Sequence, residues 1–218
     1  MRTVFAILLF VSCAAAQTSY DSLFRKSTVY KNLTAHFELS RIQRADIVFL
    51  GNSITYGGNW SELLGREKIV NRGIGGDNLP GMLNRLHQVL RLNPKICFVM
   101  GGINDLYTDA PVKEVFQRYT QLIDSLRAHA VTPVIQSTLH VNPKWKRTEE
   151  KNPQVRILND MLRQYAVDRS ITFIDLNTLL SAGGVLKDEY TTDGVHLTPA
   201  AYAVWRDMLE SVLKKHGL

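Results

Sequence analysis

A serine, an aspartate and a histidine occur in local contexts that suit nucleophilic catalysis. Ser53 stands in the segment GNSI, directly after an apolar run, and Asp193 precedes His196 by three residues in the segment DGVH. A serine hydroxyl is a weak nucleophile that needs an adjacent base. An imidazole can be that base when a carboxylate fixes its tautomer and stabilises its protonated form. Ser53, His196 and Asp193 are therefore candidates for the nucleophile, the base and the orienting acid of an acyl transfer.

Acyl transfer also needs hydrogen-bond donors that face the oxyanion of the transition state, and losing one donor typically lowers the rate about 100- to 1000-fold. Gly76, in the segment GIGGD, can bring its backbone N–H close to a substrate because it has no Cβ atom. Asn104, in the segment GGIND, offers a side-chain amide. Together with the backbone N–H of Ser53, these groups are candidates for an oxyanion hole.

Each of these residues also has a purely structural interpretation. Serine is common as the N-cap of a helix, so Ser53 could serve only as a cap. Asp193 and His196 could cap the last helix. The glycines around Gly76 could form a tight turn, and Asn104 could bond to its own backbone. The catalytic interpretation is favoured only if the chain brings all four segments to one place.

Short apolar runs alternate along the chain with longer segments of helical periodicity. The runs predict strands at residues 46–50, 68–71, 95–100, 131–138 and 171–175. The periodicity predicts helices over 82–90, 112–126 and 155–165, and Thr198-Pro199 predicts the N-cap and first residue of a last helix. The stretch 140–153 is polar and contains two prolines, which predicts a surface loop.

This alternation favours βαβ units and hence an α/β fold, a three-layer α/β/α sandwich around a parallel sheet of five strands. Ligands of such sheets bind outside the carboxyl ends of the strands. The segments GNSI, GIGGD and GGIND follow the first three predicted strands, and DGVH directly precedes the last helix. We therefore expect all four segments to meet at one edge of the sheet.

The composition argues against several other classes of protein. The 26 Lys and Arg residues exceed the 20 Asp and Glu residues only modestly, and they cluster only at Lys144, Lys146 and Arg147, so no nucleic-acid partner is expected. The two cysteines, Cys13 and Cys97, are too few for a disulfide framework or a zinc site, and no metal or other cofactor is expected. Cys97 lies in an apolar run and is expected in the core. The segment GIGGDN lacks the third glycine of a dinucleotide fingerprint and follows the second strand instead of the first.

The first residues have the pattern of a secretory signal peptide, residues 1–16. Arg2 precedes the apolar stretch 4–11, and three alanines at 14–16 offer a cleavage site. The stretch is too short to span a bilayer, which takes about 20 apolar residues, and no later segment is apolar enough. Alternatively, VSC resembles a lipoprotein cleavage box with Cys13 as the lipid-modified residue, although Phe10 stands where that box has Leu. The protein is thus expected to be secreted or periplasmic, or else lipid-anchored. Residues 17–44 are expected to pack as a helical segment on a single domain, 45–218.

Four segments in order, FLGNSITYGG, NRGIGGD, GGIND and DGVHL, resemble the sequence blocks of the SGNH (GDSL-like) hydrolase family. The resemblance covers about residues 46–205 and implies a flavodoxin-like sheet with strand order 2-1-3-4-5. It assigns Ser53 as nucleophile, Gly76 and Asn104 to the oxyanion hole, and Asp193 and His196 to the triad. Asn52 stands where the name-giving motif has Asp, which alters the local hydrogen bonding but retains the nucleophile. NRGIGGD, the 140–153 stretch and HLTPAAY are similar to platelet-activating-factor acetylhydrolase subunits, and more similar to secreted bacterial carbohydrate or sialate O-acetylesterases.

We therefore expect a metal-independent serine esterase that removes a short acyl group, acetyl, from an O-acylated carbohydrate. The short acyl group is inferred because no extended apolar lid is evident, and the sugar is inferred from secretion and from the subgroup resemblance. The alternatives are a lysophospholipase or thioesterase, and a carbohydrate-binding protein that keeps the scaffold without turnover. Candidate residues of the substrate pocket are Tyr56, Trp60, Leu79, Met82, His140 and Trp145.

Overall fold

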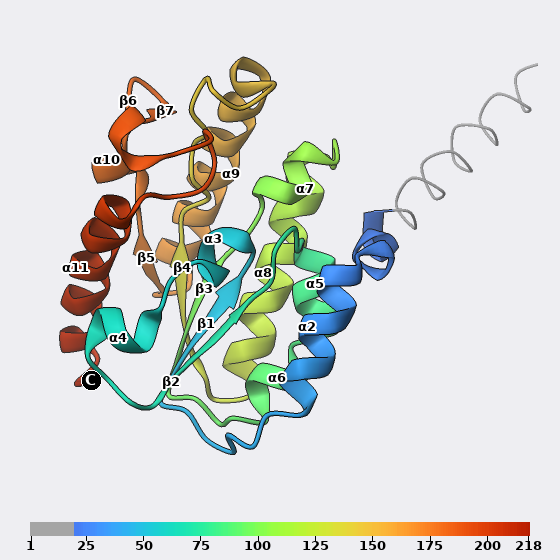
Figure 1. Ribbon diagram of the computed structural model, residues 1–218, viewed down its shortest axis with the longest axis vertical. Coiled ribbons are helices and arrows are strands. Elements are labelled where there is room, and N and C mark those ends of the chain that lie inside the picture. The colour runs from blue at the N-terminus through green and yellow to red at the C-terminus, as the bar shows by residue number, and fades with distance from the viewer. Residues whose placement is uncertain (1–19) are drawn as a thin grey trace, which may run out of the picture.

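A parallel sheet of five strands forms the centre of the computed structural model, which describes residues 20–218 (Figure 1). The strand order is β2-β1-β3-β4-β5, and all neighbouring strands are parallel. The strands are β1 (Ile47–Gly51), β2 (Ile69–Gly73), β3 (Ile96–Met100), β4 (Thr132–Gln136) and β5 (Thr172–Ile174). The fold class and the sheet order expected from the sequence are confirmed.

Helices cover both faces of this sheet and complete the three layers. In Figure 1, α2, α5 and α8 lie on one side of the sheet, and α4 and α11 lie on the other. Every residue of β1 and β3 is buried, as expected for central strands that are covered on both faces. The helices are α2 (Thr28–Glu38), α3 (Ser53–Tyr56), α4 (Trp60–Leu64), α5 (Leu79–Asn84), α6 (His87–Leu90), α7 (Ile103–Tyr107), α8 (Val112–Ala128), α9 (Thr148–Asp168), α10 (Asn177–Leu180) and α11 (Pro199–Lys215). Two 3₁₀ turns, η1 (Leu23–Lys26) and η2 (Asp188–Tyr190), and a hairpin of β6 (Ser181–Ala182) and β7 (Val185–Leu186) complete the elements.

Helix α11 begins where the sequence predicts, because the side chain of Thr198 accepts a hydrogen bond from the Ala201 N–H and caps the helix. The helix predicted over 82–90 is instead divided into α5 and α6. Between them, Arg85 leaves helical geometry (φ −106°, ψ 13°), and its side chain turns into the core to pair with Asp77. A polar contact inside the protein thus interrupts a helix that the apolar periodicity predicts to be continuous.

The prediction of a surface loop over 140–153 is wrong for its second part, because α9 already begins at residue 148 and includes Pro153. A proline inside a helix removes one backbone hydrogen bond. Contacts of the neighbouring side chains hold these turns in place. Asn152 exchanges two hydrogen bonds of 2.9 Å with the backbone of Val141, and the buried Lys151 donates to Asp109 at 2.7 Å.

The described part of the N-terminal segment packs against α5 and the loop after β2. The Tyr30 hydroxyl donates to the Gly81 carbonyl at 2.9 Å, and Phe24, Tyr30 and Ile74 form a small buried cluster. The predicted signal peptide and Cys13 lie outside the described residues. From residue 20 onward, none of the helices is both long enough and apolar enough to cross a membrane.

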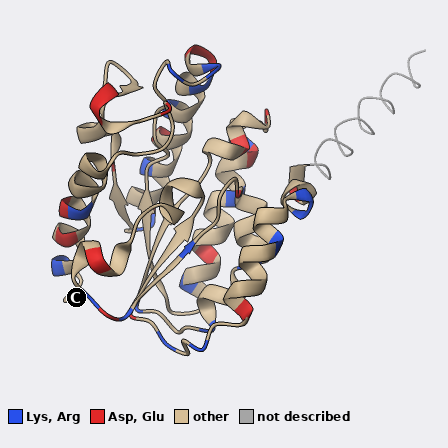
Figure 2. Ribbon diagram, in the orientation of Figure 1, with Lys and Arg blue, Asp and Glu red and all other residues tan. Residues whose placement is uncertain are grey.

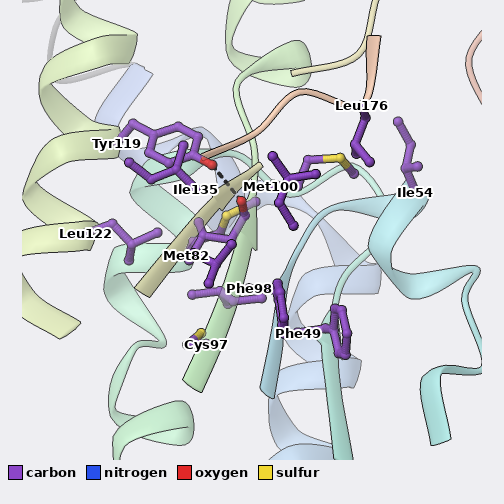
Figure 3. Packing of buried hydrophobic residues seen from close by; sticks show 14 of the residues in the cluster. Phe49, Ile54, Met82, Cys97, Phe98, Met100, Tyr119, Leu122, Ile135 and Leu176 are labelled. Atoms are coloured by element: carbon purple, nitrogen blue, oxygen red, sulfur yellow. Dashed lines mark hydrogen bonds between the residues drawn. The ribbon is translucent and has the colours of Figure 1, made fainter. Parts of the chain in front are cut away.

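The main core lies between the sheet and its helices (Figure 3). Cys97 in β3 is fully buried, so it is a core residue as predicted. This burial raises the pKa of its thiol. Tyr119 of α8 is also fully buried, and its hydroxyl lies 2.6 Å from the Val99 carbonyl and 3.1 Å from the Gln136 carbonyl. The hydroxyl therefore links α8 to the ends of two strands.

Replacing Tyr119→Phe should lower the free energy of unfolding by about 1–2 kcal/mol, because the buried carbonyls lose a donor that no water replaces. Urea denaturation would measure this change. Tyr165→Phe is the matched control, since the Tyr165 hydroxyl bonds to the exposed Asp124 and water can replace it. If both substitutions lowered the free energy of unfolding equally, the buried hydrogen bonds of Tyr119 would contribute no more to stability than the exposed one of Tyr165.

Candidate active site

Ser53, His196 and Asp193 form a continuous chain of hydrogen bonds at the carboxyl edge of the sheet. His196 Nε2 lies 3.0 Å from Ser53 Oγ, and His196 Nδ1 lies 2.6 Å from Asp193 Oδ2. Ser53 opens α3, separated by one residue from the end of β1, and the other two residues lie in the loop before α11. The Asp193 carboxylate can only accept a hydrogen bond, so the neutral imidazole of His196 carries its proton on Nδ1. Nε2 then has no proton and accepts a hydrogen bond from the Ser53 hydroxyl. The arrangement can move a proton from serine to histidine.

The turn before α3 leaves the Ser53 hydroxyl free for this contact. The N-cap of α3 is Asn52, whose side-chain oxygen accepts from the Ile54 N–H at 3.0 Å. Asn52 is buried, and an amide oxygen serves here as well as a carboxylate oxygen would. The interpretation of Ser53 as a helix cap is therefore wrong, because its neighbour fills that role.

Asp193 is held as an anion by donors on three sides. Its Oδ1 accepts from the backbone N–H groups of Val195 (2.9 Å) and His196 (2.8 Å), while Oδ2 faces the imidazole. Partial burial by itself raises the pKa of Asp193, but these hydrogen bonds outweigh it and lower the pKa to about 2. Gly194, the residue after Asp193, has a φ of +100°. A Cβ atom on it would lie 2.6 Å from the Trp145 backbone nitrogen. Only glycine fits this position.

Three N–H groups near the ends of β1, β2 and β3 are available as donors. Gly76 has a φ of +73°, and its exposed N–H has no acceptor among residues 20–218. A Cβ on Gly76 would meet no protein atom within 4 Å, so within the protein it is the positive φ of this residue that favours glycine. Asn104 donates one side-chain N–H to the Asp77 carbonyl at 2.7 Å and keeps the other. The N–H of Ser53, at the first position of α3, has no acceptor within its helix.

A buried ion pair connects the loops that carry Ser53 and Gly76. Arg85 Nε donates to Asp77 Oδ2 at 2.8 Å, and Arg85 Nη2 donates to the Gly51 carbonyl at 3.1 Å. Neither charged side chain is more than 1% exposed. Burial outweighs the charge of Arg85 and raises the pKa of Asp77. Because Asp77 follows Gly76 directly, its contacts determine where the Gly76 N–H stands relative to Ser53.

A second buried carboxylate, Asp105, follows Asn104. Its Oδ1 accepts from the Leu79 N–H at 2.9 Å and from the Tyr20 hydroxyl at 2.5 Å, whereas Oδ2 has no partner within the described chain. Burial raises the pKa of Asp105 to about 6, although the hydrogen bonds from Tyr20 and Leu79 act in the opposite direction. Asp105 thus ties α7, which carries Asn104, to the start of α5 and to the N-terminal segment.

Sequence reasoning missed Asp77, Arg85, Asp105 and Tyr20 as supports of the site. One signal was present, because Arg85 falls three residues after Met82 and four before Val89, on the apolar face of the predicted helix. A charge at such a position must be paired when it is buried. The partners, in contrast, come from distant parts of the chain.

Three predicted pocket residues belong to the core instead. Leu79 and Met82 are fully buried, and Trp60 is 1% exposed, with its ring stacked on Phe49 at 4.3 Å between centroids. Their apolar side chains pack in the main hydrophobic core and are not available at the surface. The prediction that these residues contact substrate is therefore wrong.

The other three predicted pocket residues are more accessible. Tyr56 shares α3 with Ser53 and is 55% exposed, so it lies at the rim of the site. Trp145 is half-buried, and its backbone packs against Gly194 next to His196. His140 instead bonds to Ser181 Oγ at 3.1 Å, at the start of the β6–β7 hairpin, and burial lowers its pKa. Throughout residues 20–218, no cluster of three or more His, Cys, Asp and Glu side chains could hold a metal ion.

Comparisons with known proteins agree with this fold. The model of the GDSL-like lipase/acylhydrolase family matches residues 49–204. An N-acylneuraminate cytidylyltransferase of Streptococcus agalactiae is 29% identical over 172 residues, which are 78% of this chain but 38% of that protein. The isoamyl acetate-hydrolyzing esterase of Saccharomyces cerevisiae is 22% identical over 171 residues, 71% of this chain and 72% of that one. A solved GDSL-like lipase from Bacteroides thetaiotaomicron has the same fold, with a TM-score of 0.75 and 22% identity over 86% of this chain and 98% of its own.

The raised pKa of Asp105 predicts a specific dependence of stability on pH. An unfolded aspartate titrates near pH 3.9, so between about pH 4 and pH 6 the folded protein binds more protons than the unfolded chain, and stability falls as pH rises. Asp105→Asn keeps the acceptor oxygen but does not titrate. The free energy of unfolding of the wild type, relative to this variant, should fall by about 2 kcal/mol from pH 4 to pH 7.

Denaturant unfolding of both proteins at several pH values would measure this difference, with Asp124→Asn at the surface as the control. Parallel pH curves for the wild type and Asp105→Asn would show that the buried carboxylate does not titrate in this range.

Proposed function

The chain belongs to the GDSL-like lipase/acylhydrolase family, and we propose that it is a serine esterase that removes an acetyl group from an O-acetylated carbohydrate. The observation that carries the mechanism is the hydrogen-bond chain from Ser53 Oγ through His196 to Asp193. A hydroxyl, an imidazole and a carboxylate in this order are the groups that activate a serine for attack on an ester carbonyl.

In the first half of the reaction, Ser53 Oγ attacks the acyl carbon while His196 Nε2 takes the hydroxyl proton across 3.0 Å. The ionised Asp193 stabilises the imidazolium that forms. The developing oxyanion is held by the N–H groups of Ser53 and Gly76 and by the free N–H of the Asn104 amide. His196 then gives its proton to the leaving alcohol, and an acyl-enzyme remains.

In the second half, a water molecule takes the place of the alcohol. His196 accepts a proton from this water, the hydroxide adds to the acyl carbon, and the same donors hold the second oxyanion. Return of the proton to Ser53 Oγ releases the carboxylic acid and restores the starting state. In this mechanism, side chains and backbone N–H groups of the site act on two substrates, the ester and water.

Two relatives support the acyl group and the sugar. The yeast relative is named for the hydrolysis of an acetate ester, and the streptococcal relative is named for an acylated acidic sugar, N-acylneuraminate. This chain spans less than half of the streptococcal protein, so only the matching part of that protein is comparable. The signal pattern at residues 1–16 accords with a substrate outside the cytoplasm.

Ser53→Ala should lower kcat for acetyl esters by at least about 10⁴-fold without loss of the fold, because the nucleophile is removed. Release of acetate would be measured from acetylated sialic acid, acetylated xylo-oligosaccharide and p-nitrophenyl acetate, with a lysophospholipid as the competing substrate class. Ser61→Ala, at an accessible serine eight residues later, is the matched control. Wild-type turnover by Ser53→Ala would overturn the mechanism. Preference for the lysophospholipid would retain the mechanism and replace the substrate.

Asn104→Ala should lower kcat about 100- to 1000-fold and change KM little, since the amide acts on charge that exists only in the transition state. Steady-state kinetics with p-nitrophenyl acetate would separate the two constants, and thermal unfolding would confirm that the variant is folded. A folded variant that lost less than about tenfold would remove Asn104 from the oxyanion hole.

A further inference from the structure

A surface cavity of about 620 Å³ lies between the start of α9 and the β6–β7 hairpin. Its walls include Trp145 and Arg156 on one side and the hairpin turn Gly183-Gly184 on the other. A volume of this size is typical of a site for a small organic molecule. None of the proposed catalytic residues lines it.

The turn that lines the cavity is also in contact with the loop that carries Asp193 and His196. The turn that carries Trp145 is bonded to the catalytic loop, because the Asn142 N–H donates to the Gly194 carbonyl at 2.8 Å. The same turn is also bonded to α7, the helix that carries Asn104. The Tyr107 hydroxyl of α7 donates to the Lys146 carbonyl at 2.7 Å. The turn that carries Trp145 therefore lies between the catalytic loop and the cavity.

The charges on the lining favour an anion that carries hydroxyl groups. Both basic and acidic residues occur at the start of α9 (Figure 2), but Arg147 is already paired with Asp109 and Glu150. Lys146 and Arg156 are exposed and have no acidic partner within residues 20–218, so their charges are available to a ligand.

The other lining groups suit a sugar ring. Glu149 can accept hydrogen bonds from hydroxyl groups, and the half-buried indole of Trp145 offers a flat apolar surface. A guanidinium, a carboxylate and an indole together fit a pyranose that bears one carboxylate better than they fit a neutral sugar or an acyl chain.

We propose that this cavity binds the leaving group of the reaction, and that this group is a sugar carrying a carboxylate. The inference rests on the proposed esterase function for the chemistry at Ser53. Arg156 and Lys146 bind the carboxylate, the ring lies along Trp145, and the acetylated hydroxyl points back past the turn at Gly194 to the serine. Arg156 then determines specificity and takes no part in bond breaking.

Binding is tested separately from turnover, in the Ser53→Ala protein. The probes are free N-acetylneuraminic acid and its carboxamide, which has the same ring but no charge, and calorimetry gives the two dissociation constants. The acid should bind at least about tenfold more tightly than the amide, and Arg156→Gln should remove most of that difference. Arg169→Gln at the far end of α9 removes the same charge away from the cavity and should change nothing.

Kinetics of the active protein complete the test. Arg156→Gln should raise KM for the acetylated acid about tenfold and leave p-nitrophenyl acetate within about twofold. Equal binding of acid and amide, no binding of either, or an unchanged affinity in Arg156→Gln would each overturn the cavity proposal. Absence of hydrolysis of every ester, with Arg156-dependent binding intact, would overturn the proposed function and leave the binding site standing.

Discussion

The buried ion pair between Asp77 and Arg85 is the contact on which the geometry of the site depends. Through it the loop after β2 is bonded to the end of β1, and the Asp77 carbonyl receives the amide of Asn104 from the loop after β3. A buried pair is weak evidence for stability, because desolvation offsets much of the attraction. Its contribution here is to fix the positions of the loops that it connects. The contacts of Arg85 and the hydrogen bond from Asn104 together hold three strand ends, and with them three N–H groups, in a single arrangement, and Arg85 also separates α5 from α6.

The N-terminal segment supports the same region, although the family match begins only at residue 49. Tyr20 bonds to Asp105, Tyr30 bonds to the Gly81 carbonyl, and Ile74 of the glycine-rich loop packs with this segment in a cluster of its own. In the proposed mechanism, this loop presents the Gly76 N–H to a substrate, so that N–H cannot be used to fix the loop within the protein. Residues that precede the matched region therefore support the loops that carry the candidate donors.

The fold was largely predictable because its signals are local. Five apolar runs, the periodicity between them and the Thr198-Pro199 start of α11 are each read within a few residues, and the sheet order followed from the family resemblance. The motif positions of Ser53, Asp193 and His196 could be named in advance, and the structure places them within hydrogen-bond distance. The supporting contacts could not be named, because the partners of Arg85 and Asp105 lie on other elements. The same limit made Leu79 and Met82 pocket candidates, since exposure depends on what covers a residue.

The two sides of the active site differ in how they are built. The donors that would hold an oxyanion rest on buried charges and on the sheet, so a change there alters both stability and catalysis. The cavity side consists of exposed side chains on a turn and a hairpin, joined to the catalytic loop by backbone contacts. Substitutions on such surfaces usually change stability by less than about 0.5 kcal/mol. Under the proposed function, exchanging Lys146, Glu149 or Arg156 would therefore vary the leaving group without disturbing the proposed catalytic groups, whose positions are constrained by the core.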